Sequence, residues 1–202
     1  MQLLLIRHAQ PLASVGEGSS DPALSELGVQ MAERLPVALR RFGITRIVSS
    51  PQLRAHQTAE PLGAALGLPI ETDPRFAEYD FGLDEYVPVE QMLAENPDAL
   101  ARLLDGHLPA GVDENAFRER VLAANADVAA AAQPSDRVAV FTHGGVINVV
   151  LGDVLGTPAL FPFRIDYVSV SQVGYYGPGK AAVVGVNNIE HVWDLLPRLS
   201  RR

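Results

Sequence analysis

Short apolar runs alternate with amphipathic segments along most of this sequence. The run at 3–6 is brief and wholly apolar, the pattern typical of a strand that is buried on both faces, and the segments 44–49 and 137–141 also predict strands. Longer segments place apolar residues three or four positions apart and so predict helices. We expect these helices at 25–41, 53–66, 89–104, 113–132 and 144–155.

Two later segments, 164–173 and 181–186, are rich in β-branched residues and enclose Gly-Tyr-Tyr-Gly-Pro-Gly, which predicts a hairpin with a longer loop. A further short strand is expected at 69–73, and Pro36 is expected to kink or split the segment 25–41. Strands that alternate with helices and end in a hairpin predict an α/β fold. We expect a three-layer α/β/α sandwich with a mixed, mostly parallel central sheet.

Composition and charge narrow the class of protein. The chain has 202 residues, a length that fits one domain, 1–202, and it has no cysteine, which excludes disulfides, thiolate zinc sites and cysteine nucleophiles. A net charge of −8 argues against binding to nucleic acid or to an anionic membrane surface, since either partner requires a basic face. No apolar run reaches the ~20 residues that cross a bilayer, and the first residues lack a signal-peptide pattern. We therefore expect a cytoplasmic protein.

Basic and imidazole side chains stand at the points where the predicted strands end. Arg7 and His8 follow the first run, and His143 follows the third. Arg54 comes after the second run, on the first turn of a helix for which Ser50 is expected to be the N-cap. Taken one at a time, each has a plain structural explanation as a solvated arginine or a buried histidine.

The joint placement of these side chains favours an anion site. Open α/β sheets bind ligands at the carboxyl edge of their parallel strands, so neighbouring strands would bring the arginines and histidines into one pocket. The glycine pair that begins at Gly144 lets a ligand approach the backbone, and the start of its helix offers N–H groups to an anion. Guanidinium forks and imidazoles suit a phosphoryl group. The residues alone therefore predict a phosphate-ester site.

The segments that carry these residues resemble the motifs of the histidine phosphatase superfamily, in its phosphoglycerate-mutase-like branch. They are Leu-Ile-Arg-His-Ala at 5–9, Ser-Ser-Pro-Gln-Leu-Arg-Ala-His-Gln-Thr-Ala at 49–59 and Thr-His-Gly-Gly-Val-Ile at 142–147, with a weaker match in Leu-Ser-Glu-Leu-Gly at 24–28. They span most of the chain in the family's order and spacing. The resemblance implies a metal-independent phosphatase that acts on small phosphomonoesters and needs no cofactor.

The resemblance also implies a catalytic role for each residue at the strand ends. His8 would be the nucleophile that becomes phosphorylated on a ring nitrogen. Arg7, Arg54 and His143 would hold the phosphoryl oxygens and stabilise the transition state. These groups would supply the positive charge that magnesium supplies in other phosphoryl-transfer enzymes.

Three further positions follow from the same resemblance. Gly144 and Ser14 are expected to contact the substrate, although Ser14 stands where the family often has asparagine. Glu78 is implied as the general acid, because a leaving alkoxide needs a proton and a buried carboxylic acid can supply it. The rivals for this role are the nearby carboxylates Asp80, Asp84 and Glu85.

The reaction itself has open alternatives. Tyr-Asp-Phe-Gly at 79–82 is typical of the family's phosphatases, whereas its mutases tend to have Arg-His after the glutamate. Leu-Asp-Glu-Tyr at 83–86 departs from the usual phosphatase pattern and leaves the substrate undetermined. A phosphoglycerate-type mutase and a catalytically idle phospholigand-binding regulator stay as alternatives. The expected partner is a small phosphorylated molecule, and a homodimer is left open.

Overall fold

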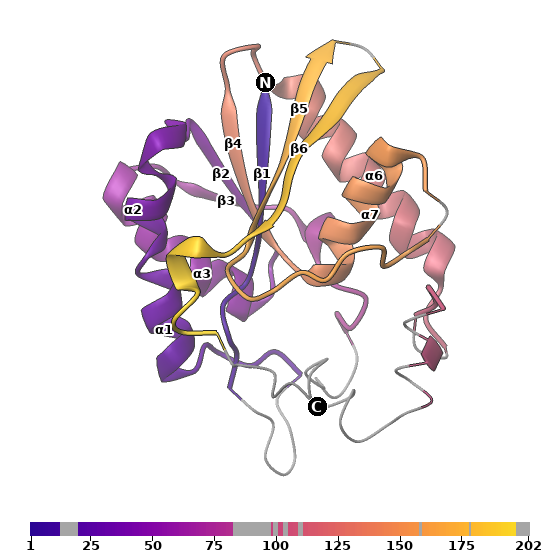
Figure 1. Ribbon diagram of the computed structural model, residues 1–202, viewed down its shortest axis with the longest axis horizontal. Coiled ribbons are helices and arrows are strands. Elements are labelled where there is room, and N and C mark those ends of the chain that lie inside the picture. The colour runs from indigo at the N-terminus through magenta and orange to yellow at the C-terminus, as the bar shows by residue number, and fades with distance from the viewer. Residues whose placement is uncertain are drawn as a thin grey trace.

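Six strands form one mixed sheet through the middle of the molecule (Figure 1). They are β1 (Gln2–Arg7), β2 (Arg46–Ser49), β3 (Ile70–Thr72), β4 (Arg137–Thr142), β5 (Val170–Gly177) and β6 (Lys180–Asn188). Their order is β3-β2-β4-β1-β5-β6, in which the first four strands are parallel and the β5–β6 hairpin joins β1 in antiparallel fashion. The computed structural model describes residues 1–12, 20–82, 98, 101–102, 105–108, 111–157, 159–177 and 179–196.

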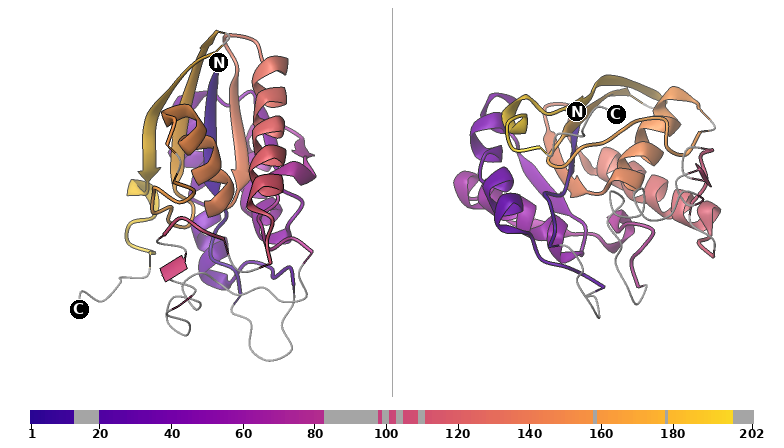
Figure 2. Two further views of the ribbon diagram at one scale, coloured as in Figure 1. Left: turned by 90° about the vertical axis from the view of Figure 1, so that its right-hand side faces the viewer. Right: turned by 60° about the horizontal axis from the view of Figure 1, so that its bottom comes forward.

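Helices cover both faces of this sheet (Figures 1 and 2). One face carries α1 (Glu26–Ala32), α2 (Leu35–Leu39) and α3 (Leu53–Leu66), and the other carries α6 (Glu114–Ala131) and α7 (Gly144–Leu155). The described residues also include the short 3-10 turns η1 (Arg40–Phe42), η2 (Pro74–Phe76) and η3 (Glu190–Val192). The predicted three-layer α/β/α sandwich is thus confirmed. Within the described ranges, every helix falls short of the length and apolar character that crossing a membrane demands.

Two apolar cores form because successive residues of a strand point to opposite faces of the sheet. In β1, Leu3 and Leu5 pack with α6 and α7, whereas Leu4 and Ile6 pack with α1, α2 and α3. All four side chains are fully buried. Each contributes roughly 1.5–3 kcal/mol of transfer free energy to folding. Burial on both faces explains why the run at 3–6 is apolar without alternation.

Most of the described helices lie where the pattern predicts them. The bounds of α3 and α7 match the expected 53–66 and 144–155. The segment 25–41 splits into α1, α2 and η1, with Pro36 in the first turn of α2, where its missing N–H removes no helical hydrogen bond. The helix expected at 89–104 lies mostly outside the described residues.

The prediction that Ser50 caps α3 is wrong. Ser50 N donates to Phe141 O at 2.9 Å, so this residue still belongs to the hydrogen-bond ladder between β2 and β4, and the N-cap is Gln52. The Asp21 carboxylate instead accepts from Leu53 N at 2.9 Å, which satisfies a free N–H at the helix start. Arg54 still falls on the first turn, as predicted.

The predicted hairpin is present, but the bounds of its strands were predicted wrongly. Residues 164–169 lie outside β5, because Val168 adopts a φ of 56° and its N–H donates to Arg7 O at 3.1 Å, against the end of β1. The segment expected to be a glycine-rich loop is largely paired instead, with Gly174 opposite Ala182 and Gly177 opposite Lys180. Pairing with a partner strand overrides the local preference of glycine for turns.

The register of the sheet brings three strand ends to one edge. Arg7 pairs with Thr142 and Ser49 pairs with Phe141, so β4 lies between β1 and β2 and ends level with both. His8 N donates to Thr142 O at 2.8 Å, just beyond the end of β1. The residues that follow these three strands therefore meet at the carboxyl edge of the parallel strands, the lower edge in Figure 1.

Candidate active site

His8 is a buried imidazole with a defined tautomer. Its Nδ1 lies 2.8 Å from Ala9 O, and because a carbonyl oxygen only accepts, Nδ1 carries the proton and Nε2 keeps its lone pair. Burial, and then the positive charges of Arg54 and Arg7, hold the pKa of His8 well below its usual value. The ring is therefore neutral at neutral pH, the state in which Nε2 is a nucleophile.

Two buried arginines supply positive charge around the histidines. Arg7 Nη1 donates to Ile165 O at 2.7 Å, and its guanidinium carbon lies 4.1 Å from the centre of the Tyr167 ring. Arg54 Nη2 donates to both carboxylate oxygens of Asp80, at 2.9 and 3.1 Å. Arg7 is the last residue of β1 and Arg54 lies on the first turn of α3, which follows β2, as the sequence predicted; β4 lies between these two strands.

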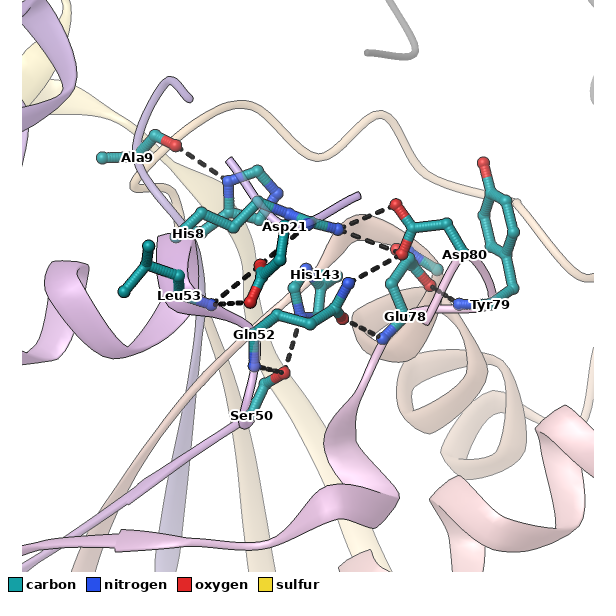
Figure 3. A network of polar contacts seen from close by, with 12 residues as sticks. His8, Ala9, Asp21, Ser50, Gln52, Leu53, Glu78, Tyr79, Asp80 and His143 are labelled. Atoms are coloured by element: carbon teal, nitrogen blue, oxygen red, sulfur yellow. Dashed lines mark hydrogen bonds and ion pairs between the residues drawn. The ribbon is translucent and has the colours of Figure 1, made fainter. Parts of the chain in front are cut away.

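His143 stands between the end of β4 and the start of α7. Its ring centre is 5.1 Å from that of His8, and its Nε2 lies 2.8 Å from Ser50 Oγ (Figure 3). Burial, followed by the charge of Arg54, keeps the pKa of His143 well below its usual value. Its Nδ1 is also buried, and no described residue hydrogen-bonds to it. A buried polar atom of this kind is costly unless a ligand pairs with it.

Glu78 is a buried carboxyl group beside these side chains (Figure 3). Its Oε2 accepts from Gly145 N at 2.8 Å and its Oε1 accepts from Tyr79 N at 3.2 Å. Burial and the nearby charge of Asp80 raise the pKa of Glu78 to about 7. At neutral pH this carboxyl group can therefore both give up and take back a proton.

The rival carboxylates differ from Glu78 in their environment. Asp80 forms an ion pair with Arg54 at 2.9 Å and accepts from Gln52 Nε2 at 2.8 Å, so its oxygens already face two donors. Asp84 and Glu85 lie outside the described residues, as does Ser14.

Gly145, the second glycine at the start of α7, has a structural role that the sequence analysis did not assign. A Cβ at Gly145 would overlap the Glu78 carboxylate, so this position must lack a side chain for that carboxylate to accept from its backbone N–H. At Gly144 the nearest atom to such a Cβ is Arg7 Nε, at 4.0 Å, an ordinary contact. The predicted substrate contact of Gly144 stays a prediction, and the need for Gly145 was missed.

Arg120 of α6 is another side chain that the pattern did not single out. Its Nη1 donates to Arg75 O and Ala77 O, both at 2.7 Å, and its Nη2 donates to Glu78 O at 3.0 Å. One guanidinium thus holds the backbone of the segment that carries Glu78. No local signal reveals this role, because Arg120 lies more than 40 residues from its partners in the chain.

Together these groups form a site suited to a phosphoryl group. Two guanidiniums, two neutral imidazoles and a carboxyl group with a near-neutral pKa come together at the carboxyl edge of the parallel strands. Among the described residues, no group of three histidine, aspartate or glutamate side chains could hold a metal ion. A combination of fixed positive charge, a nucleophile and an acid is what phosphoryl transfer requires.

The fold and the motifs are those of the histidine phosphatase superfamily. The family model described as "Histidine phosphatase superfamily (branch 1)" matches residues 3–189, and the chain belongs to this superfamily. A curated relative from Yersinia pestis, named "Probable phosphoglycerate mutase GpmB", is 29% identical over 184 residues, which cover 87% of this chain and 85% of the relative.

Solved structures include phosphatases with the same fold. The mycobacterial glucosyl-3-phosphoglycerate phosphatase Rv2419c is 27% identical with a TM-score of 0.77, covering 92% of this chain and 98% of its own. The alpha-ribazole phosphatase from Shigella flexneri is 25% identical with a TM-score of 0.73, covering 93% of this chain and 96% of its own. The relatives thus include proteins named as phosphatases and proteins named as mutases.

Proposed function

We propose that this protein is a phosphatase that hydrolyses small phosphomonoesters through a phosphohistidine intermediate, without a metal ion. The observation that carries the proposal is the pairing of His8, whose Nε2 keeps its lone pair, with Glu78, a buried carboxyl group whose pKa is raised to about 7. A carboxyl group holds a proton near neutral pH only when its environment raises its pKa in this way, and the lowered pKa of His8 keeps the nucleophile neutral beside it.

The reaction proceeds in two displacements. His8 Nε2 attacks phosphorus while the bond to the leaving oxygen breaks, and Glu78 gives its proton to that oxygen. A water molecule then attacks the phosphohistidine and loses a proton to the Glu78 carboxylate, which releases inorganic phosphate and restores His8. Arg7, Arg54 and His143 hold the non-bridging oxygens in both steps. Gly144 and Ser14 are further proposed contacts to the substrate.

The charge beside the pocket favours a phosphomonoester without a further carboxylate over a phosphoglycerate as the substrate. Asp80 is ion-paired with Arg54, and an Asp21 oxygen lies 3.7 Å from Arg54 Nη1. These carboxylates would repel the additional carboxylate of a phosphoglycerate. The mutase alternative rests on the curated relative that carries the mutase name.

One assay separates the three candidate activities. The parent protein, treated with a chelator, is expected to release p-nitrophenol from its phosphate ester and inorganic phosphate from glycerol phosphate. Inactivity on both esters across pH 4–8 would instead indicate a binding protein. Interconversion of phosphoglycerate isomers, followed by phosphorus NMR and faster than phosphate release, would indicate a mutase.

Glu78→Gln is expected to lower kcat/KM for alkyl phosphates about 10²-fold at pH 6 and to remove the pH dependence on the alkaline side. Glu78 must hold its proton in order to donate it, and its pKa is about 7, so the parent should lose activity as the pH rises above about 7. His8 stays unprotonated over this range because its pKa is lowered. Profiles of kcat/KM against pH measure both effects.

Glu60→Gln is the matched control, because Glu60 is an exposed residue of α3 that pairs with His56. It should keep the parent profile. An alkaline decline that persists unchanged in Glu78→Gln would assign the acid to another group. The substrate's own second ionisation, near pH 6, shapes the acidic side of every profile alike.

The cytoplasmic location, the single domain and the small phosphorylated partner belong to this proposal. Whether two chains form a homodimer stays open, and sedimentation of the purified protein would decide it.

A further inference from the structure

We infer that Gln52 is a positioning residue for the general acid: its buried side-chain amide links the backbone of Glu78 and the Arg54–Asp80 ion pair to the start of α3. The inference rests on the proposed function, since it takes Glu78 to be the acid. Gln52 does not contact the reacting atoms; it would act through Glu78.

Both polar atoms of the Gln52 side-chain amide form hydrogen bonds. Its Nε2 donates to Asp80 Oδ1 at 2.8 Å, and its Oε1 accepts from Glu78 N at 2.7 Å (Figure 3). The side chain is only 1% exposed, so water cannot replace these partners without a structural change. One residue therefore joins two members of the site that are 26 and 28 positions away in the chain.

The backbone of Gln52 is itself firmly held. It is the N-cap of α3, its N–H donates to Ser50 Oγ at 3.2 Å, and its carbonyl accepts from Ala55 N at 2.9 Å and His56 N at 3.1 Å. Ser50 Oγ is also the partner of His143 Nε2. The same junction between β2 and α3 thus sets the position of the acid, through Gln52, and that of the second histidine, through Ser50.

Glu78 depends on such distant contacts because its own segment has little regular structure. It follows the short turn η2, and no helix or strand holds residues 77–82. Its N–H is held by Gln52, its carbonyl by Arg120 and its carboxylate by Gly145. Two of these three contacts start close to strand ends, since Gln52 lies three residues beyond Ser49 of β2 and Gly145 lies three residues beyond Thr142 of β4.

The chemistry of the amide fits this place better than any other side chain of its size. The bridge needs a donor toward a carboxylate and an acceptor toward an N–H, which a carboxamide supplies at once. Leucine has a similar volume and supplies neither. A glutamate would supply acceptors only and would put a second negative charge beside Asp80, unless it is protonated.

The test uses the dependence of kcat/KM on the leaving group. A nitrophenolate leaves without help from an acid, whereas the alkoxide of glycerol phosphate must be protonated. A misplaced acid therefore lowers kcat/KM for glycerol phosphate and spares p-nitrophenyl phosphate. Damage to the phosphate pocket, or partial unfolding, lowers both alike. The ratio of the two kcat/KM values thus reports on the acid alone.

Gln52→Leu is expected to lower the glycerol phosphate to p-nitrophenyl phosphate ratio about 10- to 10²-fold, since displacement of a catalytic group by about 1 Å costs that much. Glu78→Gln should lower the same ratio at least as far. Gln57→Leu is the matched control: Gln57 also lies on α3 and its Oε1 also accepts a backbone N–H, from Leu24 at 2.8 Å. That variant should keep the parent ratio.

Gln52→Glu is a second test of the same role, in which the side chain keeps its volume. Above the pKa of the introduced carboxyl group the ratio should fall as in Gln52→Leu. As the pH drops and that group gains a proton, it again offers one donor and one acceptor, and the ratio should recover toward the parent value. A thermal melt of each variant shows whether it is folded. If Gln52→Leu does not fold, Gln52→Glu decides whether Gln52 positions the acid.

The outcomes separate this inference from the proposed function. A shifted ratio in Glu78→Gln with parent ratios in both Gln52 variants, or equal losses for the two esters in those variants, overturns the role of Gln52. An unchanged ratio in Glu78→Gln overturns the acid itself and with it the proposed mechanism.

Discussion

Replacement of His8 by alanine is expected to lower kcat/KM at least about 10⁴-fold, for aryl and alkyl phosphates alike. The proposed nucleophile would be gone, and the ring centre of His143, the other imidazole of the site, lies 5.1 Å from the position that the His8 ring occupied. Initial rates with p-nitrophenyl phosphate measure the loss. Binding of inorganic phosphate should largely persist, because the arginines remain.

The phosphorylated intermediate provides a direct check. Parent protein mixed rapidly with a radiolabelled ester and quenched should carry a phosphoryl group that acid removes and alkali does not, whereas His8→Ala should carry none. His56→Ala serves as control, since this partly exposed histidine of α3 pairs with Glu60 away from the pocket. Label that survives in His8→Ala, or turnover within tenfold of the parent, would contradict the proposed nucleophile.

Replacement of Arg54 by methionine is expected to lower kcat/KM about 10³-fold, the effect typical of losing an arginine that stabilises phosphoryl transfer. Arg54 is 1% exposed, and its guanidinium is the partner of the Asp80 carboxylate. Its loss leaves that buried carboxylate uncompensated, so the free energy of unfolding should also fall, by about 3 kcal/mol. Urea unfolding and steady-state kinetics measure the two effects separately.

A double variant distinguishes folding from catalysis. Arg54→Met combined with Asp80→Asn removes both charges, and we expect it to regain most of the lost stability while its kcat/KM stays low. Recovery of activity together with stability would mean that Arg54 acts on the fold and not on the phosphoryl group. The exposed pair of Arg46 and Glu71 is the control, because removal of both charges there should change neither kcat/KM nor the free energy of unfolding by much.

Much of the fold could be predicted from local pattern. The run at 3–6 is apolar because both faces of β1 are buried, and the periodic segment at 53–66 is helical over its whole predicted length. Errors arose where tertiary contacts opposed local preference. Pairing across the sheet turned a glycine-rich loop into strand, and a ladder hydrogen bond to Phe141 O kept Ser50 from capping α3.

The amino-acid sequence by itself determined the fold class and the meeting of Arg7, His8, Arg54 and His143. Each of these follows a short apolar strand, and the ends of adjacent parallel strands share one edge, so no distant contact is needed to expect them together. Resemblance to the family, and not pattern, singled out Glu78.

Only the tertiary structure decided how Glu78 is held and that its pKa is raised. Burial and the neighbouring Asp80 raise the pKa of Glu78, whereas Arg54 pairs with Asp80. The partners that hold its segment, Gln52 and Arg120, lie 26 and 42 positions away. Solvent exposure and long-range pairing depend on how the layers pack around the sheet. Neither can be predicted from a pattern that repeats every few residues.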